Sequence, residues 1–315
     1  MIFTSMLANS SVILTEGAVI ERLWRETTLA LDPNVANAGF IYDPAKKVAL
    51  VKIYRQYLVA IQPSGLPLLL FTPTWRANPE RLKRAGLGNL DVNGDCYRFL
   101  ARLRADYGEY AQQIWIGGLL GCQGDAYNPQ EGLTTPQARS FHRWQAAALA
   151  TAGVDFLFAA TLPAAEEALG LAQAMAETGK SYFLSFVVRP TGTLLDGTPL
   201  SETVATIDAG TAPPPLGYLI NCVHPIVFEQ ALQARQNATG SARRRIIGFQ
   251  ANTSAKSPEE LNGSVELKSE TPAVFARQLI KLQNRWNLKI LGGCCGTDQR
   301  HLRALMARLK KQPMI

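Results

Sequence analysis

Eight short apolar stretches alternate with longer segments of helical character along nearly the whole chain. Continuous apolar runs of this length, bounded by turn-forming residues, are typical of strands buried on both faces of a parallel sheet. An alternation of strands and helices requires crossover connections, and eight such units favour closure of the sheet. The sequence therefore predicts the α/β fold class, as a single-domain (β/α)8 TIM barrel. We expect its strands at Ser11–Leu14, Pro67–Thr72, Gln113–Gly121, Phe156–Ala160, Tyr182–Val188, Gly217–Cys222, Arg245–Asn252 and Leu288–Gly293.

Helices are expected between these strands, because apolar residues recur there at helical spacing. No linker rich in glycine and serine and no change of composition divides the chain, so we expect one domain over residues 1–315. The predicted helices are Ile20–Glu26, Val48–Ile61, Cys96–Tyr107, Phe141–Ala150, Pro163–Thr178, Val204–Ala209, Pro225–Arg235, Thr271–Asn284 and His301–Leu309.

Composition narrows the classes of partner. The first residues carry no positively charged leader, and no apolar run approaches the length of a membrane span, so we expect no membrane association. Five cysteines, an odd number, favour the reducing cytoplasm. The net charge of +7 is scattered except at Arg243–Arg245 and Lys310–Lys311, which indicates a solvated surface and no nucleic-acid partner. Oligomeric state is not set by the sequence.

Three of the cysteines are placed for metal binding. Cys294 and Cys295 are neighbours between glycines, and disulfide geometry disfavours a bridge between them. Cys222 ends another apolar run, so all three should lie at the carboxyl rim of the barrel. Three thiolates and one open position are the ligand set of a catalytic zinc site. The alternative is that the pair consists of buried structural cysteines, which pack as small hydrophobic residues.

The motif Asn221-Cys222, followed by Gly-Gly-Cys-Cys-Gly-Thr at residues 292–297, resembles the zinc signature of the homocysteine S-methyltransferase family. The resemblance implies a (β/α)8 barrel, a Zn²⁺ cofactor held by Cys222, Cys294 and Cys295, and methyl transfer to a zinc-bound thiol. The implied small-molecule partners are a thiol, homocysteine, which becomes methionine, and a methyl donor. S-Methylmethionine or S-adenosylmethionine is our first expectation for the donor, followed by betaine. The chain has no room for a cobalamin module.

Substrate-binding residues are predicted next to this centre. Glu16 ends the first strand and is followed by Gly17 and Ala18, where the family usually has an aspartate followed by glycine. A carboxylate at the carboxyl end of a barrel strand is a functional candidate. The alternative is a surface glutamate beside a turn. We expect Glu16 and Asn221 to orient the substrate.

One departure bears on the acceptor. The family usually has a glutamate before Thr-X-Pro that helps to hold the amino-acid end of homocysteine, and this chain has Ala160 there. A different small thiol or selenol is therefore an alternative acceptor, and a non-catalytic zinc-binding barrel is a third interpretation.

Four further side chains are assigned minor roles. Cys122 could be a fourth thiol near the site, and His224 a substitute ligand, although a hydrogen-bonded histidine in a turn is the simpler interpretation. His142 and His301 are expected at helix starts with local hydrogen bonds.

Overall fold

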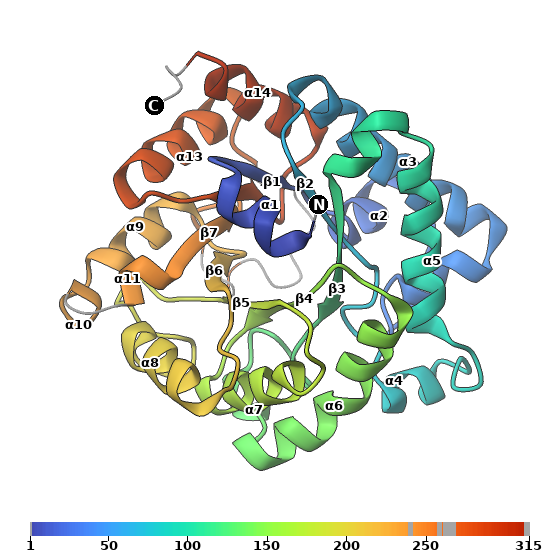
Figure 1. Ribbon diagram of the computed structural model, residues 1–315, viewed down its shortest axis with the longest axis horizontal. Helices are drawn as coiled ribbons and strands as arrows, with labels where there is room; N and C mark the ends of the chain where they lie inside the picture. Colours follow the sequence, from blue (N-terminus) through green and yellow to red (C-terminus); the bar gives the residue numbers. More distant parts are fainter. Residues whose placement is uncertain (1, 239–241, 257–259, 261–268, 312–315) are drawn as a thin grey trace.

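The computed structural model describes residues 2–238, 242–256, 260 and 269–311. Its eight strands are parallel and form a closed barrel in chain order, and helices surround them (Figure 1). Closure is made by β1 against β8, with Ile13 paired to Ile290. The fold class predicted from the strand–helix alternation is confirmed, whereas the extent of the domain, residues 1–315, stays a prediction. The strands are β1 Ile13–Thr15, β2 Leu68–Phe71, β3 Ile114–Leu120, β4 Phe156–Leu162, β5 Tyr182–Phe186, β6 Gly217–Asn221, β7 Ile246–Ala251 and β8 Ile290–Gly293.

The helices and 3₁₀ turns occupy the connections. In the described ranges, none of the helices is both long and apolar enough to cross a membrane. The α-helices are α1 Phe3–Asn9, α2 Ile20–Glu26, α3 Pro44–Ile61, α4 Pro79–Arg84, α5 Val92–Ala105, α6 Thr135–Ala152, α7 Ala165–Ala176, α8 Leu200–Gly210, α9 Pro225–Gln233, α10 Arg235–Ala238, α11 Ala242–Arg245, α13 Pro272–Trp286 and α14 Gln299–Leu309; the 3₁₀ turns are η1 Ala38–Tyr42, η2 Gln62–Ser64, η3 Gly108–Gln113 and η4 Pro129–Glu131.

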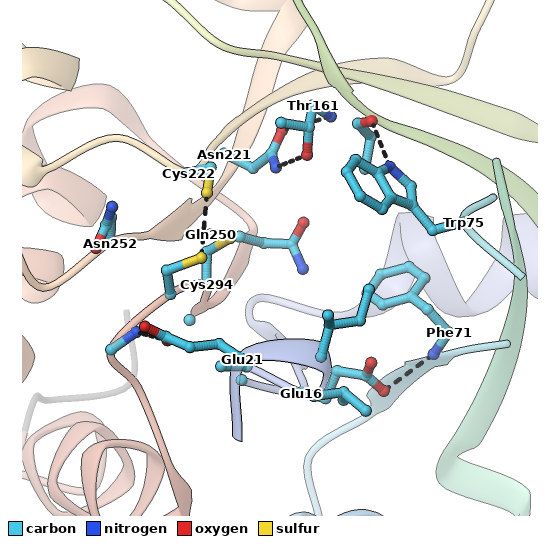
Figure 2. A pocket seen from close by; sticks show the side chains of 18 of the residues that line it. Glu16, Glu21, Phe71, Trp75, Thr161, Asn221, Cys222, Gln250, Asn252 and Cys294 are labelled. Atoms are coloured by element: carbon cyan, nitrogen blue, oxygen red, sulfur yellow. Dashed lines mark hydrogen bonds between the residues drawn. The ribbon is translucent and has the colours of Figure 1, made fainter. Parts of the chain in front are cut away.

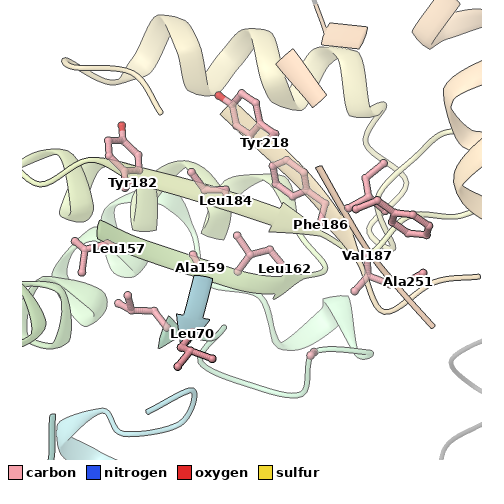
Figure 3. Close-up of a cluster of buried hydrophobic side chains, with 14 of the residues drawn as sticks. Leu70, Leu157, Ala159, Leu162, Tyr182, Leu184, Phe186, Val187, Tyr218 and Ala251 are labelled. Carbon is pink, nitrogen blue, oxygen red and sulfur yellow. The ribbon is translucent and has the colours of Figure 1, made fainter. Parts of the chain in front are cut away.

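The core has two layers because successive strand side chains point to opposite faces. On β4, Leu157 and Ala159 belong to the layer between the strands and the helices (Figure 3), whereas Phe156, Phe158 and Ala160 belong to the barrel interior. The interior is crowded with aromatic rings. On β3, Gly117 leaves space for the Phe156 ring, because an added Cβ at residue 117 would lie 2.6 Å from that ring. Side chains that alternate along each strand therefore contribute to both layers of the core.

The N-terminal helix α1 lies across the end of the barrel at which the strands begin (Figure 1). Phe3 stacks on Phe156 with ring centroids 4.5 Å apart, and its edge contacts Trp115. Lys289, which precedes β8, donates from Nζ to the Leu7 carbonyl at 2.6 Å. Sequence reasoning left this helix out, since seven residues are too few for a helical period to stand out.

Helix α6 begins six residues before the predicted start at Phe141. Thr134 and Gln137 form a capping box at its N-terminus, with Pro136 in the first turn. Consequently His142 lies inside the helix and is buried, and the prediction that it sits at a helix start was wrong. Its Nε2 lies 3.0 Å from a carboxylate oxygen of Glu167 on α7, a contact between helices.

We expect Phe3→Ala to lower the free energy of unfolding by about 3 kcal/mol, because it leaves a cavity among the rings of the barrel interior. Denaturant unfolding measures the difference, and Thr4→Ala on the exposed side of α1 is the matched control. Equal stability of the two variants would mean that α1 does not close the barrel core.

Candidate active site

The three predicted cysteine ligands converge at the carboxyl rim of the barrel. Cys222 directly follows β6, and Cys294 and Cys295 directly follow β8. Their sulfur atoms all lie within 4.8 Å of one another, with 3.5 Å between those of Cys222 and Cys295. A tetrahedral site with metal–sulfur bonds of about 2.3 Å has sulfurs about 3.8 Å apart, so the donor set fits a metal of that geometry.

Backbone contacts with β7 hold the two cysteine segments together. The Cys222 N–H donates to the Gln250 carbonyl at 3.1 Å, and the Cys294 N–H donates to the Ala251 carbonyl at 2.8 Å. Cys222 has a φ of +58°, in the left-handed backbone region that residues other than glycine rarely adopt. Such strain persists where surrounding contacts fix the chain, which is typical of functional sites.

Polar contacts favour negative charge on one of the sulfurs. Hydrogen bonds from the thiols of Cys294 and Cys295 hold the pKa of the Cys222 thiol well below its usual range, although burial opposes this. The Tyr127 hydroxyl lies 3.0 Å from the same sulfur. Tyr127 comes from the loop after β3, and no motif in the sequence marks it.

A pocket of about 550 Å³ opens beside the cysteines (Figure 2). Much of its wall is aromatic or aliphatic, and the polar side chains that face it come from several strand ends. All the predicted substrate-binding residues line it. The lining includes Glu16, Gly17, Ala18, Glu21, Trp24, Phe71, Trp75, Tyr127, Phe158, Ala160, Asn221, Cys222, Gln250, Asn252, Cys294 and Cys295.

Glu16 is a buried carboxyl group at the end of β1 and not a surface residue. One of its oxygens accepts a hydrogen bond from the Phe71 N–H at 3.0 Å. Burial raises the pKa of Glu16 well above its usual range, and the hydrogen bond from Phe71 only partly opposes this. The carboxyl group therefore sits in a position where its charged form is disfavoured unless a cation approaches.

Gly17 and Ala18 are tied to the cysteine segment through Thr297. The Ala18 N–H donates to Thr297 Oγ1 at 3.2 Å. An added Cβ on Gly17 would lie 2.7 Å from the same oxygen and 2.9 Å from the Tyr57 hydroxyl, so only glycine fits there. The loop after β1 and the loop after β8 thus form one packed unit.

Asn221 is engaged with the end of β4. Its Oδ1 accepts from the Thr161 N–H at 3.0 Å and from Ser185 Oγ at 2.7 Å, and its Nδ2 donates to Thr161 Oγ1 at 2.8 Å. Thr161 has a φ of +63°. The contacts in the structure assign Asn221 to holding this strained backbone at the pocket wall.

The remaining candidates lie outside the cysteine centre. Cys122 is buried in its own loop, where it contacts the Gly124 carbonyl, and it is not part of the cluster. His224 accepts from the Ile226 N–H at 3.2 Å, which confirms the hydrogen-bonded turn. His301 forms a capping box with Asp298, which confirms its local role. Ala160 places a methyl group in the pocket wall, and its carbonyl accepts from Trp75 Nε1 at 3.2 Å.

Comparison with known proteins agrees with this geometry. The family model of homocysteine S-methyltransferase matches residues 13–309. The chain belongs to the homocysteine S-methyltransferase family. Membership of this family indicates a methyltransferase, and it confirms the resemblance inferred from the cysteine motif.

Two kinds of relative illustrate the match. A homocysteine S-methyltransferase of Escherichia coli (strain K12) is 28% identical over 186 residues, which are 59% of this chain and 57% of the relative, so the aligned part spans little more than half of that protein. The metallated form of the homocysteine methyltransferase MmuM from Escherichia coli superimposes with a TM-score of 0.74 at 22% identity, covering 96% of this chain and 98% of that one. The oxidized form of the same enzyme gives a TM-score of 0.75 at 21% identity, covering 97% of this chain and 98% of that one. At these identities the two structures show a shared fold.

We expect Glu16→Gln to raise the free energy of unfolding at neutral pH. A carboxyl group whose pKa is raised by folding contributes stability that is fully present below its unfolded pKa, near 4.5, and is lost as the pH rises through the folded pKa. Glutamine keeps an acceptor for the Phe71 N–H without the charge. Stability of both proteins measured at pH 4 and pH 8 checks this.

The free energy of unfolding of Glu16→Gln should exceed that of the wild-type protein at pH 8 and equal it at pH 4. The exposed Glu166→Gln should match the wild-type protein at both pH values. A loss of stability at pH 8 would contradict the assignment.

Proposed function

We propose that the protein is a zinc-dependent S-methyltransferase that moves a methyl group from a sulfonium donor to the sulfur of homocysteine, giving methionine. The observation that carries the proposal is the convergence of the sulfurs of Cys222, Cys294 and Cys295 beside a pocket large enough for small molecules. The family match supports the reaction class.

Zinc is the metal we assign to the cysteines, because three thiolates that leave one position open are the ligand set of a catalytic zinc. Cys294 and Cys295 are only half-buried and line the pocket, so the open position would face the substrate. Bound zinc would supply acidification of the acceptor thiol and a fixed position for its sulfur.

The electron balance of the reaction is simple. The acceptor thiol loses a proton, and its sulfur lone pair forms the new bond to the methyl carbon. The old carbon–sulfur bond breaks with its electron pair left on the donor sulfur, which becomes a neutral thioether. Attack and departure are in line, so the chain must hold both sulfurs on opposite sides of one carbon.

A sulfonium donor fits the character of the pocket wall. Trp75, Phe71 and Phe158 contribute aromatic rings to the lining, and the ring face of an aromatic side chain attracts a cation. Phe71 and Phe158 are stacked with centroids 4.5 Å apart, which keeps this wall rigid. S-Methylmethionine and S-adenosylmethionine are the donors we propose first, and betaine, a zwitterion with a quaternary ammonium group, is second.

The acceptor has one specific alternative. It is a different small thiol or selenol, because Ala160 places only a methyl group in the pocket wall where the family usually has a glutamate. A barrel that binds zinc without catalysis is the third interpretation. The cytoplasm is our proposed location, because all five cysteines are free thiols.

We predict that the zinc-loaded protein forms methionine from homocysteine with S-methylmethionine or S-adenosylmethionine as donor. Cys294→Ser should lower the rate by about 100-fold or more, because the site loses one of the ligands that hold the metal. Mass-spectrometric detection of methionine measures the rate.

Cys122→Ser is the matched control, since this thiol is buried outside the cluster and its loss should leave the rate within about twofold. No methionine from a protein with its metal bound would direct the search to other thiols, and equal rates in the two variants would contradict the metal assignment.

Metal content gives a separate prediction that does not depend on activity. The purified protein should hold about one zinc per chain, and Cys222→Ser should hold much less after dialysis against a weak chelator. Elemental analysis of both proteins and of Cys122→Ser measures this. Retention of a full equivalent by Cys222→Ser would show that the ion sits elsewhere.

A further inference from the structure

Among the residues that the structure describes, none donates a hydrogen bond to the amide oxygen of Gln250 at the wall of the pocket. The side chain lies on β7, and the residue is only 7% exposed. Its Nε2 donates to Thr15 Oγ1 at 3.1 Å. No hydrogen bond reaches Oε1 from any residue in the ranges that the structure describes. In Figure 2 the amide projects into the pocket between the cysteines and Trp75.

The orientation of this amide is fixed by its neighbour. Thr15 Oγ1 donates its single hydrogen to the Glu16 carbonyl at 2.9 Å, so toward Gln250 it can only accept. The NH₂ group of Gln250 must therefore face Thr15, which turns the amide oxygen toward the pocket. Gly292 leaves room for this link, because a Cβ there would lie 1.8 Å from Thr15 Oγ1.

An amide oxygen that faces a pocket without a protein partner is open to a ligand that donates a hydrogen bond. Two carboxylates also line the pocket, and each already accepts at least one hydrogen bond from the protein. Glu21 accepts from the Gly296 N–H and from Arg25 Nε. Glu16 has one oxygen committed to Phe71. The methyl group of Ala160 offers no acceptor on the β4 side.

Gln250 is also close to the reacting end of the pocket. Its own carbonyl accepts from the N–H of Cys222, and its neighbour Ala251 accepts from Cys294. In homocysteine only two methylene groups separate the sulfur from the carbon that bears the ammonium group. A molecule whose sulfur lies at the cysteines would therefore carry its ammonium group close enough to reach the side of the pocket that Gln250 lines.

We propose that Gln250 recognises the α-ammonium group of the acceptor and thereby selects amino-acid thiols over thiols without an amino group. The inference rests on the proposed function and specifies its substrate class. The amide oxygen accepts a charge-assisted hydrogen bond from the ammonium group, and Thr15 keeps the amide from rotating.

The test compares the binding of homocysteine with that of 4-mercaptobutyrate, which has the same thiol and carboxylate but no ammonium group. Calorimetry on the zinc-loaded protein gives both dissociation constants. Gln250→Met, of similar shape without an acceptor, should weaken homocysteine binding about tenfold and leave 4-mercaptobutyrate within about twofold.

Gln250→Glu loses the donor to Thr15 but keeps acceptor oxygens toward the pocket, and it should preserve the preference for homocysteine, which separates recognition from damage to the fold. The exposed Gln62→Met is the matched control and should change neither constant.

An equal change for both ligands in Gln250→Met, or no change, would overturn the inference even if the wild-type protein makes methionine. Tight homocysteine binding with the predicted loss, but no methyl transfer from any donor, would overturn the proposed reaction and keep the role of Gln250. A wild-type protein that binds 4-mercaptobutyrate as tightly as homocysteine would also overturn the inference.

Discussion

Strand β7 holds the active centre together through its backbone. It lies between β6 and β8 in the barrel, and its carbonyls accept hydrogen bonds from the N–H groups of Cys222 and Cys294. Two segments far apart in sequence are thereby brought to one place, with sulfurs within 4.8 Å before any ligand is considered. Ligands that are already in position lose less conformational entropy on binding, so a metal site built on strand ends is preorganised.

The loops after the strands are locked to this centre by small residues. Gly17 and Gly293 both leave room for the Thr297 hydroxyl, which accepts from the Ala18 N–H and donates to the Cys294 carbonyl. Substitution of either glycine would push the β1 and β8 loops apart. The Gly-Gly-Cys-Cys-Gly-Thr motif therefore supplies two of the clustered cysteines and also packs the β1 and β8 loops against each other.

The strand ends were predictable from the sequence, and most of the site follows from them. Apolar runs that stop at Cys222 and at the Cys294–Cys295 pair place the sulfurs on one rim, because parallel barrel strands all end there. Tyr127 and Gln250 could not be found in this way. Tyr127 depends on the course of an irregular loop, and the role proposed for Gln250 depends on a hydrogen bond to Thr15, 235 residues away. Helix α1 was missed because its two buried residues, Phe3 and Met6, make no recognisable period.

The acidic groups of the pocket suit cationic ligands. Glu16 is disfavoured as an anion by its burial, which raises its pKa, and a positive charge entering the pocket would favour the charged form again. Both the proposed sulfonium donor and the ammonium group of the proposed amino-acid acceptor would bring such a charge. The wall at Ala160 carries none, so the polar attraction is concentrated on the side of β1 and β7, where Glu16 and Gln250 lie. On the proposed function, these polar groups would orient the ligands in a cavity whose other walls are largely aromatic or aliphatic, and the charge on Glu16 that is costly in the free protein would contribute to binding.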